Sequence, residues 1–331
     1  MRAFDRFGLF GVAVVVVSAC RLAPASAENI AISNYGVAAN AMPYAVALEK
    51  KFYQQQGADV TGIISSAGGG TSIRNMLAGG VAYGEANPGA TAVAIQQGAG
   101  LKIISDNVLT VAEFVWAVKP DSPIKSIKDF KGRKIGYTNP RSTSQALAIL
   151  LLQAAGLKAA DAELVRTGGF GEGVAALDIG AIDIAPMAEP VWSKFKTKYR
   201  AVAVAADILP PLDNVVGVTT VEAAARRGDF IRAVIRARRQ AVEFMNANPD
   251  EAGDIVAKAY NLEKDVARSA MRSLVTARTQ GIPYWGSGQF HLEGMKRMME
   301  VQKMVGAITG DFDIPKMIDT SFLPDDIKTP K

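Results

Sequence analysis

Short apolar runs that suit β-strands alternate with segments of helical periodicity along nearly the whole chain. The strands predicted from these runs are 30–32, 59–64, 82–86, 101–105, 113–119, 162–166, 182–186, 201–205 and 215–219. The predicted helices are 43–56, 72–78, 91–97, 144–155, 173–180 and most of the chain after residue 221. This alternation indicates an α/β fold with a mostly parallel sheet.

The longest amphipathic segment, 229–246, separates apolar from basic positions. Its predicted core face carries Ile231, Val234, Ile235, Val242 and Met245. The opposite face carries arginines at 232, 236 and 239, which are expected to be solvated.

Two strand–loop–helix units share one design. In the first, a strand leads through a glycine loop at 68–70 into a predicted helix. In the second, a strand that begins at Ile135 leads through a polar loop into Ser142, Thr143 and Ser144. A helix start leaves backbone N–H groups unpaired and carries partial positive charge, so it holds a small anion or polar group well. Two such starts predict two lobes that close on one ligand.

The character of the chain changes at 119–123, where prolines and polar residues interrupt the pattern. The predicted plan is therefore discontinuous. Lobe one comprises residues 28–117 and 218–331, and lobe two is inserted as residues 118–217. Two strands, near Trp116 and Val216, would cross between the lobes and form the hinge.

The first 27 residues are typical of an export signal. Arg2 and Arg6 precede an apolar run at 7–17, and cleavage after Ala27 would follow an Ala-Ser-Ala site. Val17-Ser18-Ala19-Cys20 also resembles a lipobox, which would leave a lipid-anchored Cys20 as the first residue. Both alternatives place the protein in the periplasm or at the outer face of the membrane.

The amino-acid composition argues against several classes of function. Cys20 is the only cysteine, so the chain after residue 27 has no disulfide, zinc–thiolate site or cysteine nucleophile. Removing residues 1–27 takes away three basic and one acidic residue, and the net charge of +5 becomes +3. That charge, without a basic run interleaved with aromatics, does not indicate a nucleic-acid partner.

His291 is the only histidine, which argues against a histidine metal site or a Ser-His-Asp triad. No cofactor and no metal are expected.

Several short motifs occur in an order known from one family. They are 42–50, the glycine loop, 127–136, Ser142-Thr143, 175–183, Glu189-Pro190 and 319–323. In this order and spacing the chain resembles solute-binding proteins of the nitrate/sulfonate/taurine class of ABC importers. That class also includes binders of thiamine-pyrimidine precursors and aromatic acids. The resemblance implies a two-lobed type II periplasmic binding fold and hinge closure around a small solute. It also implies a monomer that delivers the solute to an ABC permease with its ATPase and performs no catalysis.

The predicted ligand-binding residues lie at strand ends and helix starts, from which they would reach one cleft. They are Asn34, Tyr35, Gly69, Gly70, Thr71, Ser72, Asn87, Arg141, Ser142, Thr143, Ser144, Glu189 and Asn214. Arg141 could pair with a carboxylate or sulfonate, although the family pattern usually has a small residue or glycine there. The resemblance implies that Glu189 contacts ligand from lobe two, where it would suit an amine or a pyrimidine N–H.

The ligand class stays open between two groups. The helix starts and Arg141 favour a sulfonate, taurine or an aromatic carboxylate, whereas Glu189 and nearby aromatics favour a thiamine-pyrimidine precursor. A receptor that feeds a sensor protein instead of a permease is an alternative role. An enzyme that makes the thiamine pyrimidine would need a suitably placed histidine, and a hydrolase would need a G-x-S-x-G elbow that the chain lacks.

Overall fold

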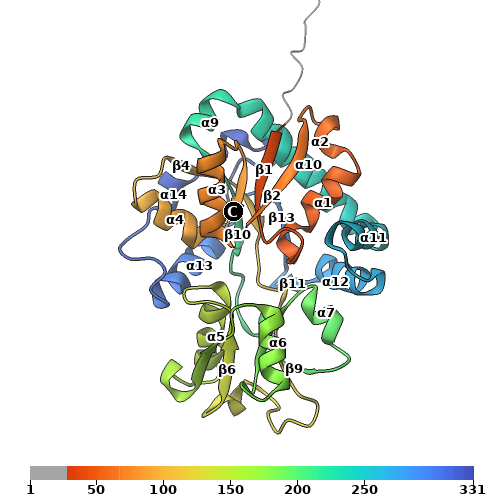
Figure 1. Cartoon of the computed structure of the whole chain (residues 1–331). Coiled ribbons are helices and arrows are strands. Elements are labelled where there is room, and N and C mark those ends of the chain that lie inside the picture. The colour runs from red at the N-terminus through yellow and green to blue at the C-terminus, as the bar shows by residue number, and fades with distance from the viewer. Residues whose placement is uncertain (1–27, 67) are drawn as a thin grey trace, which may run out of the picture.

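The computed structural model describes residues 28–66 and 68–331. The predicted export signal and Cys20 lie outside the described residues. Within them, every helix is too short or too polar to span a bilayer. The chain forms two lobes, one above the other in Figure 1, as predicted.

Lobe one is built on a six-stranded sheet with the order β13-β4-β10-β3-β1-β2. These strands are β1 (Glu28–Ser33), β2 (Val60–Ser66), β3 (Gly84–Ala86), β4 (Leu101–Val108), β10 (Val215–Thr220) and β13 (Trp285–Gly288). β1 runs parallel to β2 and β3, but β10 runs antiparallel to β3 and β4, and β13 antiparallel to β4. The prediction of a mostly parallel sheet is therefore wrong. The chain leaves for lobe two at the end of β4 and re-enters beside that end, so β10 must run in the opposite direction.

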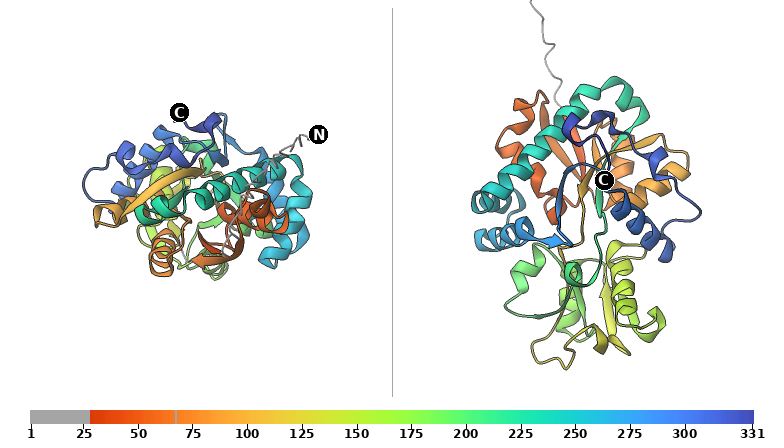
Figure 2. Two further views of the ribbon diagram at one scale, coloured as in Figure 1. Left: turned by 90° about the horizontal axis from the view of Figure 1, so that it is seen from above. Right: turned by 180° about the vertical axis from the view of Figure 1, so that it is seen from behind.

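Helices cover both faces of this sheet (Figure 2). They are α1 (Met42–Glu49), α2 (Phe52–Gln55), α3 (Gly69–Gly79), α4 (Pro88–Gln96), α9 (Val221–Arg226), α10 (Gly228–Ala247), α11 (Pro249–Tyr260), α12 (Lys264–Thr276), α13 (Leu292–Met304) and α14 (Ile314–Met317). The predicted helix 43–56 is two helices, because Lys51 adopts a left-handed φ of 58° between them. The region after residue 221 is also less helical than predicted, since β11 (Arg278–Thr279), β12 (Ile282–Pro283) and β13 interrupt it.

Lobe two contains two small sheets. In the first, β5 (Phe114–Val118) is the central strand. It pairs antiparallel with β8 (Ala185–Ala188) on one side and with β9 (Arg200–Val204) on the other. In the second, β6 (Lys134–Tyr137) pairs in parallel with β7 (Glu163–Arg166). A parallel bridge between Ile135 and Ile184 joins the two. The helices of this lobe are α5 (Thr143–Ala154), α6 (Phe170–Asp178), α7 (Val191–Phe195) and α8 (Ala205–Ile208).

Two segments connect the lobes, 109–113 between β4 and β5, and 209–214 between α8 and β10. The backbone N–H of Asn214 donates to the carbonyl of Val108 at 2.8 Å, which holds the segments together. Trp116 and Val216, the predicted crossing points, lie inside β5 and β10, a few residues after these segments.

α13 also contacts both lobes. It packs against α4 of lobe one and α5 of lobe two. Its residues Met298 and Val301 are part of the apolar core of lobe two, together with residues between 111 and 212.

A buried polar cluster lies between the sheet of lobe one and α10. All five residues of the predicted apolar face of α10 are buried, as expected, but Arg238 is buried too. Its guanidinium donates to the carbonyls of Asn107 at 2.6 Å and Gly286 at 2.8 Å, and its Nε lies 3.9 Å from Glu85 Oε1. Glu85 also accepts hydrogen bonds from Tyr44, Asn40 and Asn107 at 2.8–3.0 Å. The cluster therefore joins α10 to β3, β4 and β13.

We predict that Arg238→Met destabilises the protein by about 3–5 kcal/mol, because it leaves the buried carboxylate of Glu85 without its cation. The neighbouring Arg239, about a quarter exposed, pairs with Glu243 and Asp326 at the surface. Arg239→Met should therefore cost less than about 1 kcal/mol. Urea denaturation of the two variants tests this, and adding Glu85→Gln to Arg238→Met should recover part of the loss. Equal costs for the two arginines would contradict the prediction.

Candidate functional site

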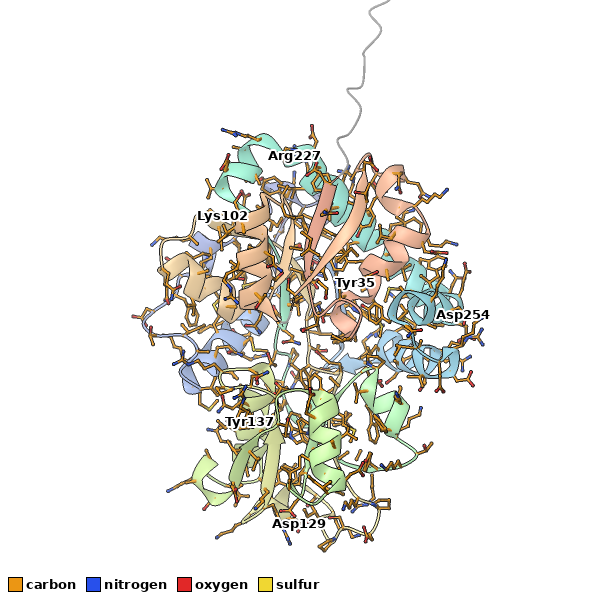
Figure 3. The ribbon with its side chains drawn as sticks, viewed as in Figure 1. Tyr35, Lys102, Asp129, Tyr137, Arg227 and Asp254 are labelled. Carbon is orange, nitrogen blue, oxygen red and sulfur yellow. The ribbon has the colours of Figure 1, made fainter. Side chains whose placement is uncertain are left out.

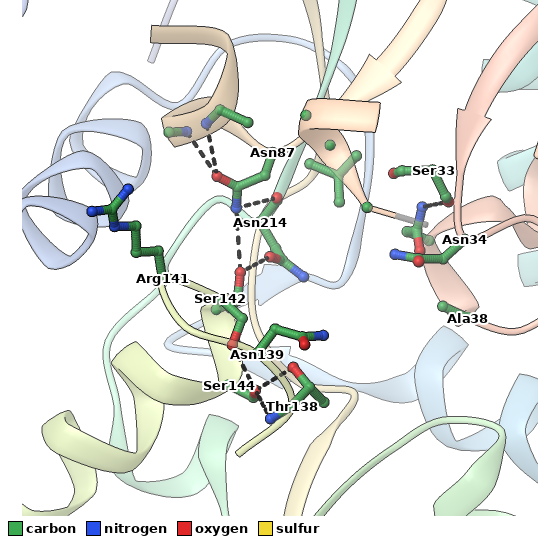
Figure 4. Close-up of a pocket in the computed structure, with 18 of the residues that line it drawn as sticks. Ser33, Asn34, Ala38, Asn87, Thr138, Asn139, Arg141, Ser142, Ser144 and Asn214 are labelled. Atoms are coloured by element: carbon green, nitrogen blue, oxygen red, sulfur yellow. Dashed lines mark hydrogen bonds between the residues drawn. The ribbon is translucent and has the colours of Figure 1, made fainter. Parts of the chain in front are cut away.

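A cavity of about 820 Å³ lies between the lobes. Figure 4 shows the residues of both lobes that approach each other there. The loops that follow β1, β3, β6 and β7 line it, together with the connecting segments at Glu113 and Asn214. Polar side chains thus meet at the carboxyl ends of strands, where ligand sites of α/β sheets occur.

Among the described residues, α3, α4, α5 and α6 all begin at this cavity, and they differ in how their first N–H groups are satisfied. In α4 the Asn87 side chain accepts from the N–H of Gly89 at 2.8 Å, and in α5 Ser142 accepts from Gln145 at 3.2 Å. α3 and α6 begin after Gly68 and Gly169, which have no side chain to cap them. Among the described residues, no side chain caps α3 or α6, so their first turns present N–H donors and partial positive charge from opposite lobes, although Glu172 adds an acidic side chain to the first turn of α6.

A glycine is required where α3 meets α4. A Cβ on Gly69 would lie 2.7 Å from the backbone nitrogen of Asn87, so a larger residue would push the two helix starts apart. The glycine loop thus brings the backbone of α3 close to the cavity, as predicted from the sequence.

Most of the predicted site residues line the cavity. They are Asn34, Gly69, Gly70, Asn87, Arg141, Ser142, Thr143, Ser144 and Asn214. Arg141 has a left-handed φ of 63°, which gives a physical reason for the glycine usual at this place in the family pattern. Its backbone N–H donates to Gln145 at 2.6 Å, so the side chain is not needed to hold the loop.

Tyr35, Thr71 and Ser72 are not among the residues that line the cavity. Tyr35, labelled in Figure 3, packs edge-on against Tyr260 with ring centroids 5.4 Å apart. Thr71 accepts a hydrogen bond from Arg74 at 2.8 Å. Ser72 is buried, and its hydroxyl donates to the carbonyl of Ala31 at 3.1 Å. Each of these side chains therefore has a structural contact.

Glu189 also lies outside the cavity. Its carboxylate accepts from the backbone N–H and the hydroxyl of Ser193, both at 3.1 Å, and so caps the first turn of α7. Burial raises its pKa, and the hydrogen bonds from Ser193 oppose that rise. The residue borders a separate depression of about 590 Å³ between α7 and α12.

The sequence patterns did not point to three residues that shape the cavity, Glu113, Phe114 and Phe170. The rings of Phe114 and Phe170 meet edge-to-face at 5.9 Å and give the cavity an aromatic wall. Glu113 could have been suspected, because it is the acidic residue that directly precedes the aromatic strand at the crossing.

Glu113 is buried, with 5% of its surface exposed. Its Oε1 accepts from the side-chain amide of Asn214 at 2.7 Å. Its Oε2 has no hydrogen-bond partner among the described residues. Burial raises the pKa of Glu113 to about 8, although hydrogen bonds from its own backbone and from Asn214 oppose the rise. The carboxyl group is therefore mainly neutral at pH 7.

Two further buried carboxyl groups, those of Asp106 and Asp213, lie at the same connecting segments. Burial raises the pKa of Asp106 to about 7, while the pKa of Asp213 lies well above its ordinary value because of burial and the nearby Asp106. The backbone N–H of His291 donates to Asp106 at 3.1 Å. Asp213 leaves little room beside it, since a Cβ on Gly294 would lie 2.3 Å from Asp213 Oδ1.

The sequence of the chain is similar to that of a known protein family. A family model described as "NMT1/THI5 like" matches residues 38–252. The chain is 24% identical over 304 residues to the riboflavin-binding protein RibY of Chloroflexus aurantiacus, covering 85% of this chain and 82% of that protein.

Solved structures share the fold. The periplasmic aliphatic sulphonate-binding protein SsuA of Escherichia coli superposes with a TM-score of 0.74 at 18% identity, covering 88% of this chain and 91% of the other. The periplasmic nitrate-binding protein NrtA of Synechocystis PCC 6803 has a TM-score of 0.69 at 15% identity, covering 92% and 87%. The predicted periplasmic binding protein fold is thereby confirmed.

We predict that Glu113→Gln changes the pH dependence of stability. The folded-state pKa of about 8 lies above the ordinary value of 4.5, so wild-type stability falls as the pH rises between these values. Glutamine cannot ionise, so the melting temperature of the variant relative to wild type should rise between about pH 5 and about pH 9. Asp106 and Asp213 titrate in both proteins, and their contributions cancel in this difference. A difference that stays constant with pH would contradict the raised pKa.

Proposed function

The chain belongs to the NMT1/THI5-like family, and we propose that it is a periplasmic receptor that captures a small organic solute between its lobes and delivers it to an ABC permease and ATPase. The observation that carries the proposal is the cavity itself, which receives side chains from lobe one, lobe two and both connecting segments. A ligand there would contact every part that moves when the lobes close by a hinge motion. The receptor would act as a monomer, without catalysis.

An organic anion fits the polar part of this cavity. The first residues of α3 and α6 line it from opposite lobes, and so do Arg74 and Arg141, while Glu172 is the acidic residue in the first turn of α6. A sulfonate or carboxylate group would accept hydrogen bonds from these donors. Sulfonates, taurine and aromatic carboxylates are therefore the first candidates, in agreement with the sulphonate named for SsuA.

A ring compound such as a flavin or a thiamine-pyrimidine precursor is the second candidate. The cavity volume of about 820 Å³ is in the upper range of small-molecule sites and leaves room beyond that needed for taurine. Phe114 and Phe170 give it an aromatic wall, and riboflavin is the ligand named for the relative RibY. The amide of Asn34, which lines the cavity, would suit ring carbonyl and N–H groups.

We predict that one of four compounds, taurine, ethanesulfonate, benzoate or riboflavin, raises the melting temperature of the protein. At about 100 times its Kd, a ligand adds about 2.7 kcal/mol of stability. Arg141→Gln should weaken binding of an anion, whereas Phe170→Leu should weaken binding of benzoate or riboflavin and leave taurine unaffected.

Ser72→Ala is the matched control, because its hydroxyl is bonded to Ala31 and lies outside the cavity lining. It should lower stability by about 1 kcal/mol and leave the affinity unchanged. A ligand whose affinity falls in Ser72→Ala but not in either cavity variant would contradict the proposed site. A panel without any shift would contradict the proposed ligand classes.

A further inference from the structure

We infer that Glu113 is a positioning residue for ligand capture, which acts through Asn214 to fix the hydroxyl of Thr143 and thereby joins α5 of lobe two to α4 of lobe one. The inference rests on the proposed function, because it concerns how the two lobes are held around the cavity. It is carried by a chain of hydrogen bonds through Asn87, Thr143, Asn214 and Glu113, part of which is visible in Figure 4.

Asn87, the first residue in this series of hydrogen bonds, fixes which atoms donate and which accept. The side-chain oxygen of Asn87 accepts from the N–H groups of Gly89 and Ala90, so it caps α4. The amide nitrogen of Asn87 must therefore point the other way. It donates to Thr143 Oγ1 and to the carbonyl of Asn214, both at 3.3 Å.

Each later residue then has one possible role. Thr143 receives the hydrogen bond from Asn87, and its single hydroxyl hydrogen donates to Asn214 Oδ1 at 3.1 Å. This orients the amide of Asn214 so that its nitrogen faces Glu113 Oε1 at 2.7 Å. Glu113 is thus the final acceptor, and without it a buried N–H of Asn214 would have no partner.

The four residues come from four separate parts of the chain. Asn87 caps α4 in lobe one, Thr143 is the first residue of α5 in lobe two, and Asn214 and Glu113 lie in the two connecting segments. A movement of α5 away from α4 must break the hydrogen bonds of Thr143. The chain therefore opposes opening at the back of the cavity, next to the hinge.

The surroundings of Glu113 favour its neutral form. Tyr284, from the segment before β13, is the titratable group that affects its pKa, and the backbone N–H of Glu189 donates to the carbonyl of Glu113 at 3.0 Å. Asp213, next to Asn214, and Asp106, near the end of β4, are further acidic groups at the connecting segments. Among the described residues, no cation contributes to the pKa of Glu113. An ionised Glu113 would carry a buried charge without a counter-ion, and opening toward water would relieve it.

The test measures the separation of the lobes without any ligand. In the full chain with Cys20 replaced by serine, spin labels are attached at Lys131→Cys in lobe two and Arg226→Cys in lobe one, both exposed. Electron–electron distance measurements should give a longer or broader distribution for Glu113→Ala and Thr143→Val than for the labelled parent. Glu113→Gln, which offers the same acceptor to Asn214, should restore the parent distribution.

Two controls separate positioning from general destabilisation. Thr167→Val removes a hydroxyl that bonds to Tyr137 and Gly169 within lobe two, and it should leave the distance unchanged. Raising the pH from about 7 to about 9.5 should lengthen the distance more in the parent than in Glu113→Gln, because Asp106 and Asp213 titrate in both proteins whereas glutamine at position 113 cannot ionise. The pH comparison of the parent with Glu113→Gln tests the role of Glu113 even where Glu113→Ala does not fold.

Three results would overturn the inference: a parent-like distribution in Glu113→Ala, equal widening in Glu113→Ala and Glu113→Gln, or a pH response of equal size in the parent and Glu113→Gln. The distances are measured without ligand, so they are independent of the compound panel. A panel in which nothing binds would count against the proposed function, and the distances would still decide the role of Glu113.

Discussion

Lobe one depends most on the hydrogen bonds that the Arg238 guanidinium donates to buried backbone carbonyls near the end of β4. At this point the sheet of lobe one ends, the chain departs for lobe two, and β10 and β13 arrive beside it. The carbonyls of Asn107 and Gly286 would lack partners in this crowded region, and two donors of one planar cation reach both. The same guanidinium lies near the Glu85 carboxylate. One side chain thus holds α10, the departing strand and the last strand of the sheet in register.

The polar groups around this point form two layers with different tasks. The layer inside lobe one, from Arg238 to Asn40, has most of its hydrogen bonds satisfied and fixes the frame. The layer at the connecting segments contains carboxyl groups with raised pKa values, Asp106, Asp213 and Glu113. Rigid, satisfied polar clusters specify one arrangement, whereas partly satisfied ones tolerate a second arrangement at low cost. The two layers are therefore adjacent but differ in how completely their carboxylate oxygens are hydrogen-bonded, since oxygens of Asp106, Asp213 and Glu113 have no partner among the described residues.

Local patterns in the sequence were enough to predict the α/β class, many of the strands and helices, and the starts of α3 and α5 at the cavity. Gly69, Ser142 and Thr143 were found because a loop before a helix has recognisable chemistry. Glu113 and Arg238 were not, because their importance comes from burial and from partners 101 and 131 residues away in sequence. The antiparallel entry of β10 was missed for the same reason, since strand direction depends on where a distant segment returns. Ser72 shows the reverse error, as its hydroxyl bonds to the neighbouring strand β1.

The position of α13 has a consequence for how the molecule could be divided. Although this helix comes after the final return to lobe one, Met298 and Val301 complete the apolar core of lobe two. A fragment cut at the two connecting segments would expose that unfilled patch to water. Lobe two is thus an insertion in sequence but not a detachable module. Fusions, truncations and circular permutations of this scaffold would have to keep α13 together with both halves.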